Sequence, residues 1–218
     1  MARIRREKDV YGKEFSGQEK RVQVEFVSAN PTGPLTIGHG RQAVLGDVIS
    51  RILEWHGYNV TREYYFNDAG RQMRILGLSV YARYMQLLGK DSELPEGGYE
   101  GEYILEIAGH FRERYGDEKN EKDIDLFIDL ASAEIFDDIR ATLERLNIRH
   151  DVYYNEKDLY TAGMIEEVLT ELEEKDLTYK ADGAVWFRAS EYGAEKDRVL
   201  VKNTGEPTYR LPAIAYHR

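Results

Sequence analysis

The sequence predicts an α/β fold with a parallel sheet flanked by helices. Three observations in residues 22–88 support this fold class: alternation of apolar and polar residues, a loop rich in glycine and proline, and apolar residues that recur every three to four positions after the loop. Alternation is typical of strands, and the longer period is typical of helices. The resulting order of strand, loop, helix, strand and helix favours a parallel sheet.

The expected elements follow in order along the chain. Residues 22–26 alternate between apolar and polar side chains, which predicts a strand. Paired apolar residues between 44 and 53 predict an amphipathic helix that ends near Gly57, a residue that tolerates left-handed geometry. The pattern then predicts a second strand over 60–66, a turn over 67–70 and a second helix over 71–88.

Helical periodicity dominates the chain beyond a turn-rich break at 89–101. We expect helices over 103–115, 123–146 and 162–175, short strands over 184–188 and 198–201, and the start of a further helix at the last residues.

The composition is that of a globular protein without cysteine chemistry. A length of 218 residues suits one large domain or two small ones, and 42% hydrophobic residues suffice for a core. The absence of cysteine excludes disulfides, thiolate metal sites and cysteine nucleophiles. No apolar run approaches the roughly 20 residues that span a bilayer, and the N-terminus has no signal-peptide pattern. We therefore expect a soluble, cytoplasmic protein with no membrane partner.

The charge is acidic overall and unevenly distributed. A net charge of −10 argues against a general nucleic-acid coat or an anionic-membrane binder, because both need cationic side chains to neutralise phosphates. Residues 1–21, however, form a basic lead-in with a net charge of +3. Two interpretations of the lead-in stay open: a surface segment or tail of a preceding domain, and a basic arm that contacts RNA.

The loop over 28–41 has the features of a phosphate site. It follows an expected strand and opens an expected helix, where free backbone N–H groups and the helix dipole face an anion. Gly38 and Gly40 allow close approach of a ligand, and His39 between them can donate a hydrogen bond to a phosphate oxygen. The alternative is a tight helix start with an incidental histidine.

Longer strings resemble a known enzyme family. VEFVSANPTGPLTIGHGR (24–41) resembles the first motif region of class I aminoacyl-tRNA synthetases and, within that class, the arginyl-tRNA synthetases. REYYFNDAGRQ (62–72), KADGAVWFRASEYGAEKDRVLV (180–201) and PTYRLPAIAYHR (207–218) are similar to further segments of the same family. The resemblance covers residues 20–218.

The resemblance implies a Rossmann-like parallel sheet with an inserted α+β subdomain. Residues 22–88 would form the first half of the ATP- and arginine-binding domain, 89–206 the insertion, and 207–218 the start of the return to that domain. The C-terminal half of the catalytic domain is missing from the string, so we expect a catalytic-domain fragment whose sheet is partial and has an exposed edge.

The resemblance implies an arginine–tRNA ligase as the parent enzyme. Such enzymes join arginine to ATP to give arginyl-adenylate and pyrophosphate, and then transfer the arginyl group to tRNA. The implied partners are arginine, ATP and the arginine tRNA, and the implied parent is a monomer. Mg²⁺ would arrive with ATP as substrate; no protein-bound metal is expected, because the five histidines have no ligand-like spacing.

Positions that match the family motifs imply residue roles. His39 and Thr36 match catalytic positions, and Pro34, Gly38, His39 and Gly40 match ATP-binding positions. Glu25, Ser28, Asn30 and Tyr209 match arginine-binding positions. A carboxylate suits a guanidinium, whose planar fork of donors is best met by a bidentate acceptor. The alternatives are an exposed strand glutamate at Glu25 and an ordinary tyrosine at Tyr209.

Two residues depart from the family pattern. Thr36 replaces the first histidine of the usual His-hydrophobic-Gly-His motif, which predicts a weaker phosphate contact. Ala213 stands where a Tyr-x-x-x-Asp pattern usually supplies an acid for the guanidinium. The missing charge-assisted hydrogen bond is worth roughly 1.5–3 kcal/mol, or about 10- to 100-fold in arginine affinity.

Three hypotheses follow from the matches and departures. The first is an enzyme fragment without full aminoacylation activity of its own. The second is a non-catalytic nucleotide- or tRNA-binding relative, which Thr36, Ala213 and the lack of a Lys-Met-Ser-Lys-Ser string would allow. The third is another class I synthetase or a small-molecule nucleotidyltransferase. Glu25 disfavours the third, because an acid in the pocket suits a cationic substrate side chain.

Overall fold

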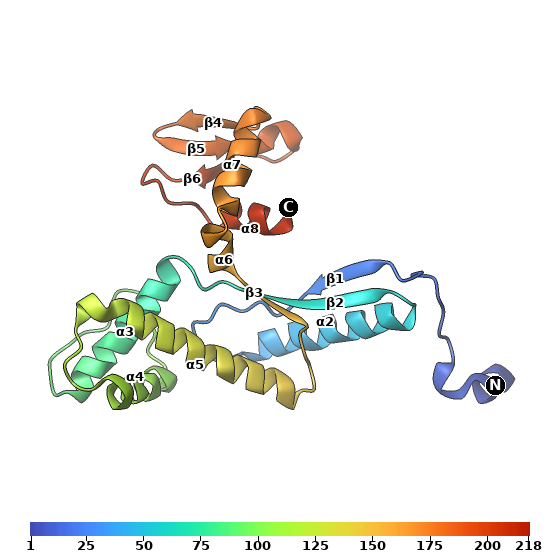
Figure 1. Cartoon of the computed structure of the whole chain (residues 1–218), viewed down its shortest axis with the longest axis horizontal. Helices are drawn as coiled ribbons and strands as arrows, with labels where there is room; N and C mark the ends of the chain where they lie inside the picture. The colour runs from blue at the N-terminus through green and yellow to red at the C-terminus, as the bar shows by residue number, and fades with distance from the viewer. The chain divides into compact units, whose positions relative to one another are not determined.

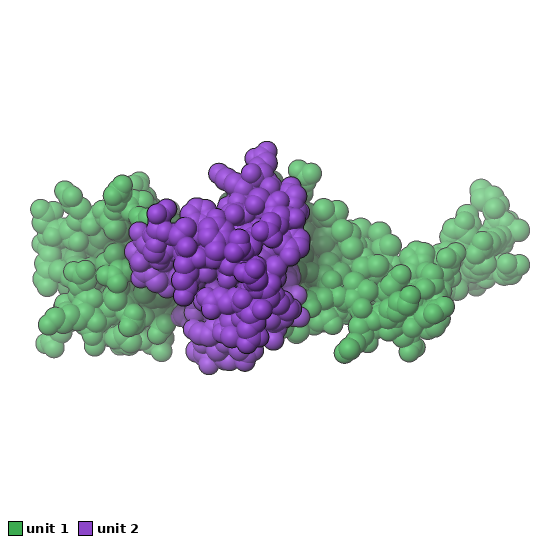
Figure 2. Space-filling view, turned by 90° about the horizontal axis from the view of Figure 1, so that it is seen from above, with its two compact units in different colours: residues 1–154 green, residues 155–218 purple.

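The first of two compact units contains a parallel pair of strands. The computed structural model describes residues 1–218, divided into residues 1–154 and 155–218 (Figure 2). In the first unit, β1 (Arg21–Glu25) pairs in parallel with β2 (Asn59–Phe66), and α2 (Ile37–Trp55) connects them. The third strand, β3 (Val152–Asn155), lies beside β2 in the order β1-β2-β3 (Figure 1). The predicted α/β fold class with a parallel sheet is confirmed.

Small residues let α2 lie close to the sheet. Ala43, Gly46 and Ser50 form its buried face, while larger apolar residues of the same helix stay exposed. A Cβ built at Gly46 would lie 2.1 Å from Cγ of Phe26, the residue that follows β1. Only glycine therefore fits this position, and the contact fixes the distance between α2 and the end of β1.

Three helices complete the first unit. α3 (Arg71–Leu87), α4 (Glu102–Tyr115) and α5 (Ile124–Arg145) pack on one another, with the rings of Phe111 and Phe127 stacked at 3.6 Å between centroids. Their buried side chains form one core with Phe26 and Tyr64 of the sheet region. The helices and the sheet of this unit therefore share a single apolar core, and the loop after β1 packs against it.

The lead-in is short and mostly exposed. It contains α1 (Ala2–Glu7) and the single-turn helix η1 (Lys8–Val10), neither of which has a buried residue. Arg3 forms an ion pair with Glu7 within α1. A further single turn, η2 (Glu121–Asp123), precedes α5.

The second unit combines an antiparallel sheet with three helices. Its sheet has the order β4-β5-β6, from β4 (Thr178–Ala181), β5 (Ala184–Phe187) and β6 (Arg198–Val201). Asp182 and Gly183 both have positive φ, which suits the two-residue turn between β4 and β5. The other elements are α6 (Glu156–Thr161), α7 (Met164–Glu174), the single turn η3 (Ala189–Tyr192) and α8 (Arg210–His217).

The structure agrees with the expected helices and strands to within a few residues and adds the single turns η1, η2 and η3 and four further elements. The elements α1, β3, α6 and β4 were not predicted from the sequence. Each is only four to six residues long, so none shows enough periodicity to be recognised. No helix of the structure has the length and apolar character needed to cross a membrane.

Replacing Gly46 with alanine is expected to destabilise the first unit. The added methyl group would overlap Phe26, and overpacking a tight contact costs about 1–3 kcal/mol. Gly109→Ala on α4 is the matched control, because a Cβ at Gly109 meets nothing within 4 Å and alanine favours helix. Urea unfolding should show a lower midpoint for G46A alone. Equal midpoints for G46A and the wild type would contradict the close contact.

Candidate functional site

The loop between β1 and α2 begins with a strained turn. Val27 has φ 67° and Ser28 has φ 40°, although valine is β-branched and rarely adopts positive φ. The Ser28 N–H donates to the carbonyl of Phe26 at 3.0 Å, which closes a three-residue turn around Val27. Such a backbone persists only where the surroundings enforce it, and strained turns often occur at functional sites.

Side chains and backbone from β2 hold the loop after this turn. The Tyr65 N–H donates to Ser28 Oγ at 3.1 Å, and the buried Tyr64 hydroxyl donates to the carbonyl of Ala29 at 2.9 Å. Burial raises the pKa of Tyr64 well above its usual range, so the phenol keeps its proton and remains a donor. Ser28 is thus fixed while its hydroxyl hydrogen can still reach a ligand.

Further along, the loop is anchored to two helices of the first unit. Asn30 donates from Nδ2 to Gln72 Oε1 at 2.8 Å, at the first turn of α3. The Tyr103 hydroxyl of α4 donates to the carbonyl of Thr32 at 2.6 Å. The string 24–41 and the string 62–72, which are distant in sequence, therefore lie against each other. The sequence analysis assigned no role to Gln72, because only the fold shows that Gln72 is hydrogen-bonded to Asn30.

The start of α2 orients His39. The Thr36 N–H donates to His39 Nδ1 at 3.1 Å, and Thr36 Oγ1 lies 3.2 Å from the same atom. Because Nδ1 accepts a backbone hydrogen bond, the proton of the neutral imidazole must be on Nε2. His39 therefore has an Nε2–H donor at the helix N-terminus. Thr36 acts here as the N-cap and as the partner that sets the tautomer of His39.

The two glycines beside His39 are not required by packing within the chain. A Cβ at Gly40 would meet nothing within 4 Å, and one at Gly38 would meet only Thr36 Oγ1, at 3.5 Å. Gly46, by contrast, lies in a tight contact. Gly38, Gly40 and the exposed Pro34 thus border open space, which leaves room for a ligand to approach the backbone.

Glu25 lies on the face of the sheet that points away from α2. It is the last residue of β1 and lies opposite Glu63, and Gln23 Nε2 donates to Glu63 Oε1 at 2.7 Å. These three side chains share one face, because side chains alternate along strands. Arg62 is on the other face, since it contacts α2. Glu25 and His39 therefore lie on either side of the sheet edge, with the strained loop between them.

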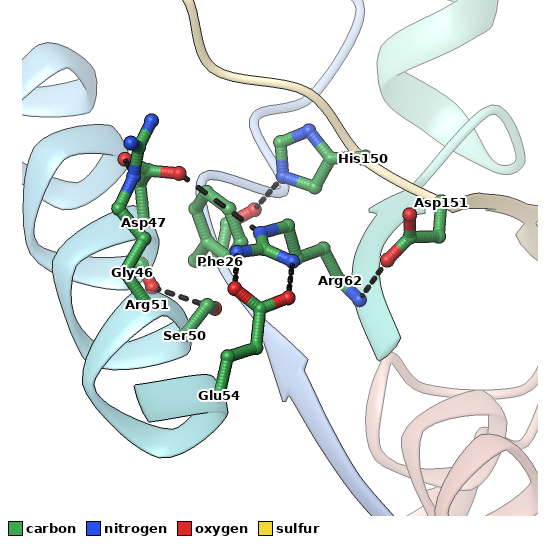
Figure 3. A network of polar contacts seen from close by, with 9 residues as sticks. All are labelled: Phe26, Gly46, Asp47, Ser50, Arg51, Glu54, Arg62, His150 and Asp151. Atoms are coloured by element: carbon green, nitrogen blue, oxygen red, sulfur yellow. Dashed lines mark hydrogen bonds and ion pairs between the residues drawn. The ribbon is translucent and has the colours of Figure 1, made fainter. Parts of the chain in front are cut away.

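A charged network joins α2 to β2 behind the loop (Figure 3). Arg62 binds Glu54 through two hydrogen bonds, Nη1 to Oε1 at 2.6 Å and Nη2 to Oε2 at 2.9 Å. The Arg62 N–H donates to Asp151 Oδ2 at 2.8 Å, and Asp47 Oδ2 accepts from Arg51 at 2.6 Å. The Arg62 side chain is 14% exposed. This bidentate pair fixes the helix that carries His39 to the strand that holds Ser28.

The two remaining positions of interest lie in the second unit. Tyr209 is the residue before α8 and is 70% exposed. The Ala213 N–H donates to the carbonyl of Tyr209, so Ala213 lies one helical turn further on and is also exposed. The spacing of the family's Tyr-x-x-x-Asp pattern is thus that of one helical turn here. The role of Tyr209 in binding arginine stays a prediction.

Comparisons with known proteins identify the family. The model of the catalytic domain of class I tRNA synthetases of the arginine type matches residues 2–217. The chain belongs to this family. The predicted resemblance to arginyl-tRNA synthetases is confirmed by relatives named arginine–tRNA ligase from Desulfotalea psychrophila, 56% identical over 95% of this chain, and Salinibacter ruber, 51% identical over 96%. The chain spans 38% and 40% of the lengths of these two relatives.

Solved structures agree with this assignment. The Campylobacter jejuni structure assigned as an arginyl-tRNA synthetase aligns with a TM-score of 0.88 and 37% identity, over 98% of this chain and 47% of that one. The Thermus thermophilus arginyl-tRNA synthetase aligns with a TM-score of 0.66 and 26% identity, over 94% of this chain and 36% of that one. The fold of the class I family is therefore present in these residues.

Glu54→Gln is expected to lower the free energy of unfolding by about 1 kcal/mol at pH 7, because Glu54 is partly exposed and its ion pair is screened. The hydrogen bonds of Arg62 hold the pKa of Glu54 below its ordinary value of 4.5. The contribution of the Glu54–Arg62 ion pair to the free energy of unfolding is therefore complete above pH 4.5. It is lost as the pH falls through the lower folded-state pKa of Glu54.

Urea unfolding at pH 7 and pH 3 tests this expectation. The difference between the wild type and E54Q should shrink in acid, because protonation of Glu54 removes the charge that E54Q lacks. Glu100→Gln, at an exposed carboxylate without an ion pair, is the control and should match the wild type at both pH values. A difference that is the same at pH 7 and pH 3 would show that the ion pair does not contribute.

Proposed function

We propose that this chain is the ATP- and arginine-binding part of an arginine–tRNA ligase. The family match over residues 2–217 carries the proposal, and the geometry of the loop after β1 supports it. In the proposed reaction the arginine carboxylate attacks the α-phosphate of ATP, giving arginyl-adenylate and releasing pyrophosphate. The arginyl group then passes to the arginine tRNA. With these substrates, the cytoplasm is the compartment that we propose.

The proposed role of the α2 end of the site is to bind ATP. His39 would donate from Nε2–H to a phosphate oxygen, and Gly38, Gly40 and Pro34 would let the nucleotide approach the backbone. Thr36 would act through His39, because its N–H holds Nδ1 of His39 as an acceptor. Mg²⁺ would enter with ATP as part of the substrate. Catalysis would consist of positioning and stabilisation of phosphate charge, with no protein nucleophile.

The proposed role of the β1 end is to bind arginine. Glu25 would accept hydrogen bonds from the guanidinium, which a carboxylate matches in geometry and charge. Ser28 and Asn30, fixed by Tyr65 and Gln72, would contact the polar groups of the amino acid. Tyr209 is a further proposed arginine-binding residue, because it matches a motif position of the family. An amino acid that reaches Glu25 and an ATP held by His39 would meet at the loop between them.

Calorimetric titration of the chain with ATP and with L-arginine tests the proposal. His39→Ala is expected to weaken ATP binding about 10- to 100-fold, since a hydrogen bond to a charged group is worth roughly 1.5–3 kcal/mol. His56→Ala, at the other end of α2, is the control and should leave ATP affinity unchanged. L-citrulline, which has a neutral urea group in place of the guanidinium, should bind far more weakly than L-arginine.

The outcomes separate the competing functions. Binding of both ligands, with loss of ATP affinity in H39A alone, supports the synthetase site. Binding of neither ligand would refute the proposal and favour a non-catalytic interaction module, which the residues Thr36 and Ala213 would allow. Equal binding of citrulline and arginine would favour a synthetase for another amino acid.

Ala213→Asp is expected to raise arginine affinity about 10- to 100-fold. The new carboxylate would lie one turn from Tyr209 and supply a charge-assisted hydrogen bond for the guanidinium. Ala141→Asp, at an exposed position of α5, adds the same charge elsewhere and serves as the control. Titration of both variants with L-arginine is the measurement, and unchanged affinity in A213D would remove Ala213 from the proposed arginine site.

A further inference from the structure

His150 packs against the residue from which the strained loop begins. It lies between α5 and β3, and its ring centroid is 4.2 Å from that of Phe26, with the planes 34° apart (Figure 3). The ring of Tyr64 meets it edge-on at 5.4 Å. The neighbouring Asp151 fixes this segment to β2, because its N–H donates to the Arg62 carbonyl at 2.9 Å and its Oδ2 accepts from the Arg62 N–H.

The hydrogen bond of His150 defines its protonation state. Nε2 lies 3.3 Å from the carbonyl oxygen of Phe26, and a carbonyl can only accept, so Nε2 carries the proton. Nδ1 is shielded from solvent and has no hydrogen-bond partner. A second proton would place an N–H group on Nδ1 with no acceptor, which is costly in a buried position. The structure therefore suits the neutral Nε2–H form of His150.

The carbonyl that His150 binds is also the one that closes the turn. The oxygen of Phe26 accepts from the Ser28 N–H and from His150 Nε2, with the strained Val27 between Phe26 and Ser28. The other end of the turn is held at the carbonyl of Ala29 by the Tyr64 hydroxyl. His150 and Tyr64, which contact each other, therefore hold the backbone on both sides of Val27 in its unfavourable conformation.

We propose that His150 is a positioning residue whose Nε2–H holds the turn around Val27 and thereby places Ser28 and Asn30 for the amino-acid substrate. His150 acts through the Phe26 carbonyl and does not touch the substrate. The identity of that substrate rests on the proposed function. The role of His150 in holding the turn around Val27 does not depend on it. A donor at this position is thus required for the shape of the amino-acid end of the site.

The same geometry makes the turn sensitive to acid. Three charged groups face His150: Asp151 beside it, Arg62 from β2 and Asp47 from α2. Burial, with a smaller effect of Arg62, lowers the pKa of His150 below its ordinary value of 6.5. The hydrogen bond to the Phe26 carbonyl and the two aspartates oppose the shift only in part. Protonation leaves the Nε2–H donor in place, so acid acts on the turn only through the cost of an unpaired N–H on the buried Nδ1. The packing of the neutral ring under the turn is therefore fully stable above pH 6.5 and is weakened as the pH falls toward the lower folded-state pKa.

Amide hydrogen exchange of the whole chain, followed by NMR, tests the proposal. His150→Phe keeps an aromatic ring without a donor, whereas His150→Gln restores a donor near the position of Nε2. His110→Gln, at an exposed histidine of α4 that pairs with Glu134, is the control. The informative amides are those of Ser28 and Tyr65, and the amide of Val24 within β1 reports opening of the sheet itself.

H150F is expected to lower the protection of the Ser28 and Tyr65 amides about 3- to 10-fold, the effect of one lost hydrogen bond. Protection at Val24 should stay unchanged, H150Q should restore protection at Ser28 and Tyr65, and H110Q should match the wild type. In the wild type, protection of the two loop amides should fall below about pH 6.5, and in H150Q it should not. Unchanged protection in H150F, or an equal loss at Val24, would overturn the proposal.

Titration with L-arginine separates this proposal from the proposed function. If the wild type binds arginine, H150F should bind it about 3- to 10-fold more weakly, with H150Q close to the wild type; equal affinity in H150F would overturn the positioning role. A wild type that does not bind arginine would refute the proposed function, and the amide protection would still decide whether His150 holds the turn.

Discussion

The parallel register of β1 and β2 determines which residues meet at the end of β1. With Glu25 opposite Glu63, the next residue of the chain still pairs with β2, because the Phe26 N–H donates to the Glu63 carbonyl at 3.2 Å. The residues that follow each strand then lie side by side, so that Tyr65 can bind Ser28. A shift of the strand register by one residue would turn these side chains to opposite faces of the sheet, and the contacts that hold the loop would be lost.

The end of β1 lies next to two different parts of α2: the closely packed Gly46 and the open N-terminus of the helix. Gly46 allows α2 to approach Phe26, and the ion pair of Arg62 with Glu54 holds the helix in place. Packing and charge thus fix the position of the helix, while Gly38 and Gly40 at its start face open space. Close packing is thus found where α2 supports the loop, and the start of α2 is open.

Local patterns predicted the fold class and the motif residues, but not the contacts between distant segments. The alternation in residues 22–26 and the helical period after it were enough to place the first strand and helix. The glycines and His39 were recognisable because they are adjacent in sequence. Gln72 and His150 were not, since they bind residues that are 42 and 124 positions away. Such contacts follow from strand register and from β3, a strand of four residues that shows too little periodicity to be predicted.

In the proposed function, one ligand spans the sheet edge, with its phosphate end at His39 and its guanidinium at Glu25. A crystal structure of the chain with a non-hydrolysable sulfamoyl analogue of arginyl-adenylate tests this most directly. The expected structure has an oxygen of the sulfamoyl group within about 3.2 Å of His39 Nε2 and the guanidinium paired with the carboxylate of Glu25. An analogue bound elsewhere, or bound here with its guanidinium away from Glu25, would contradict it.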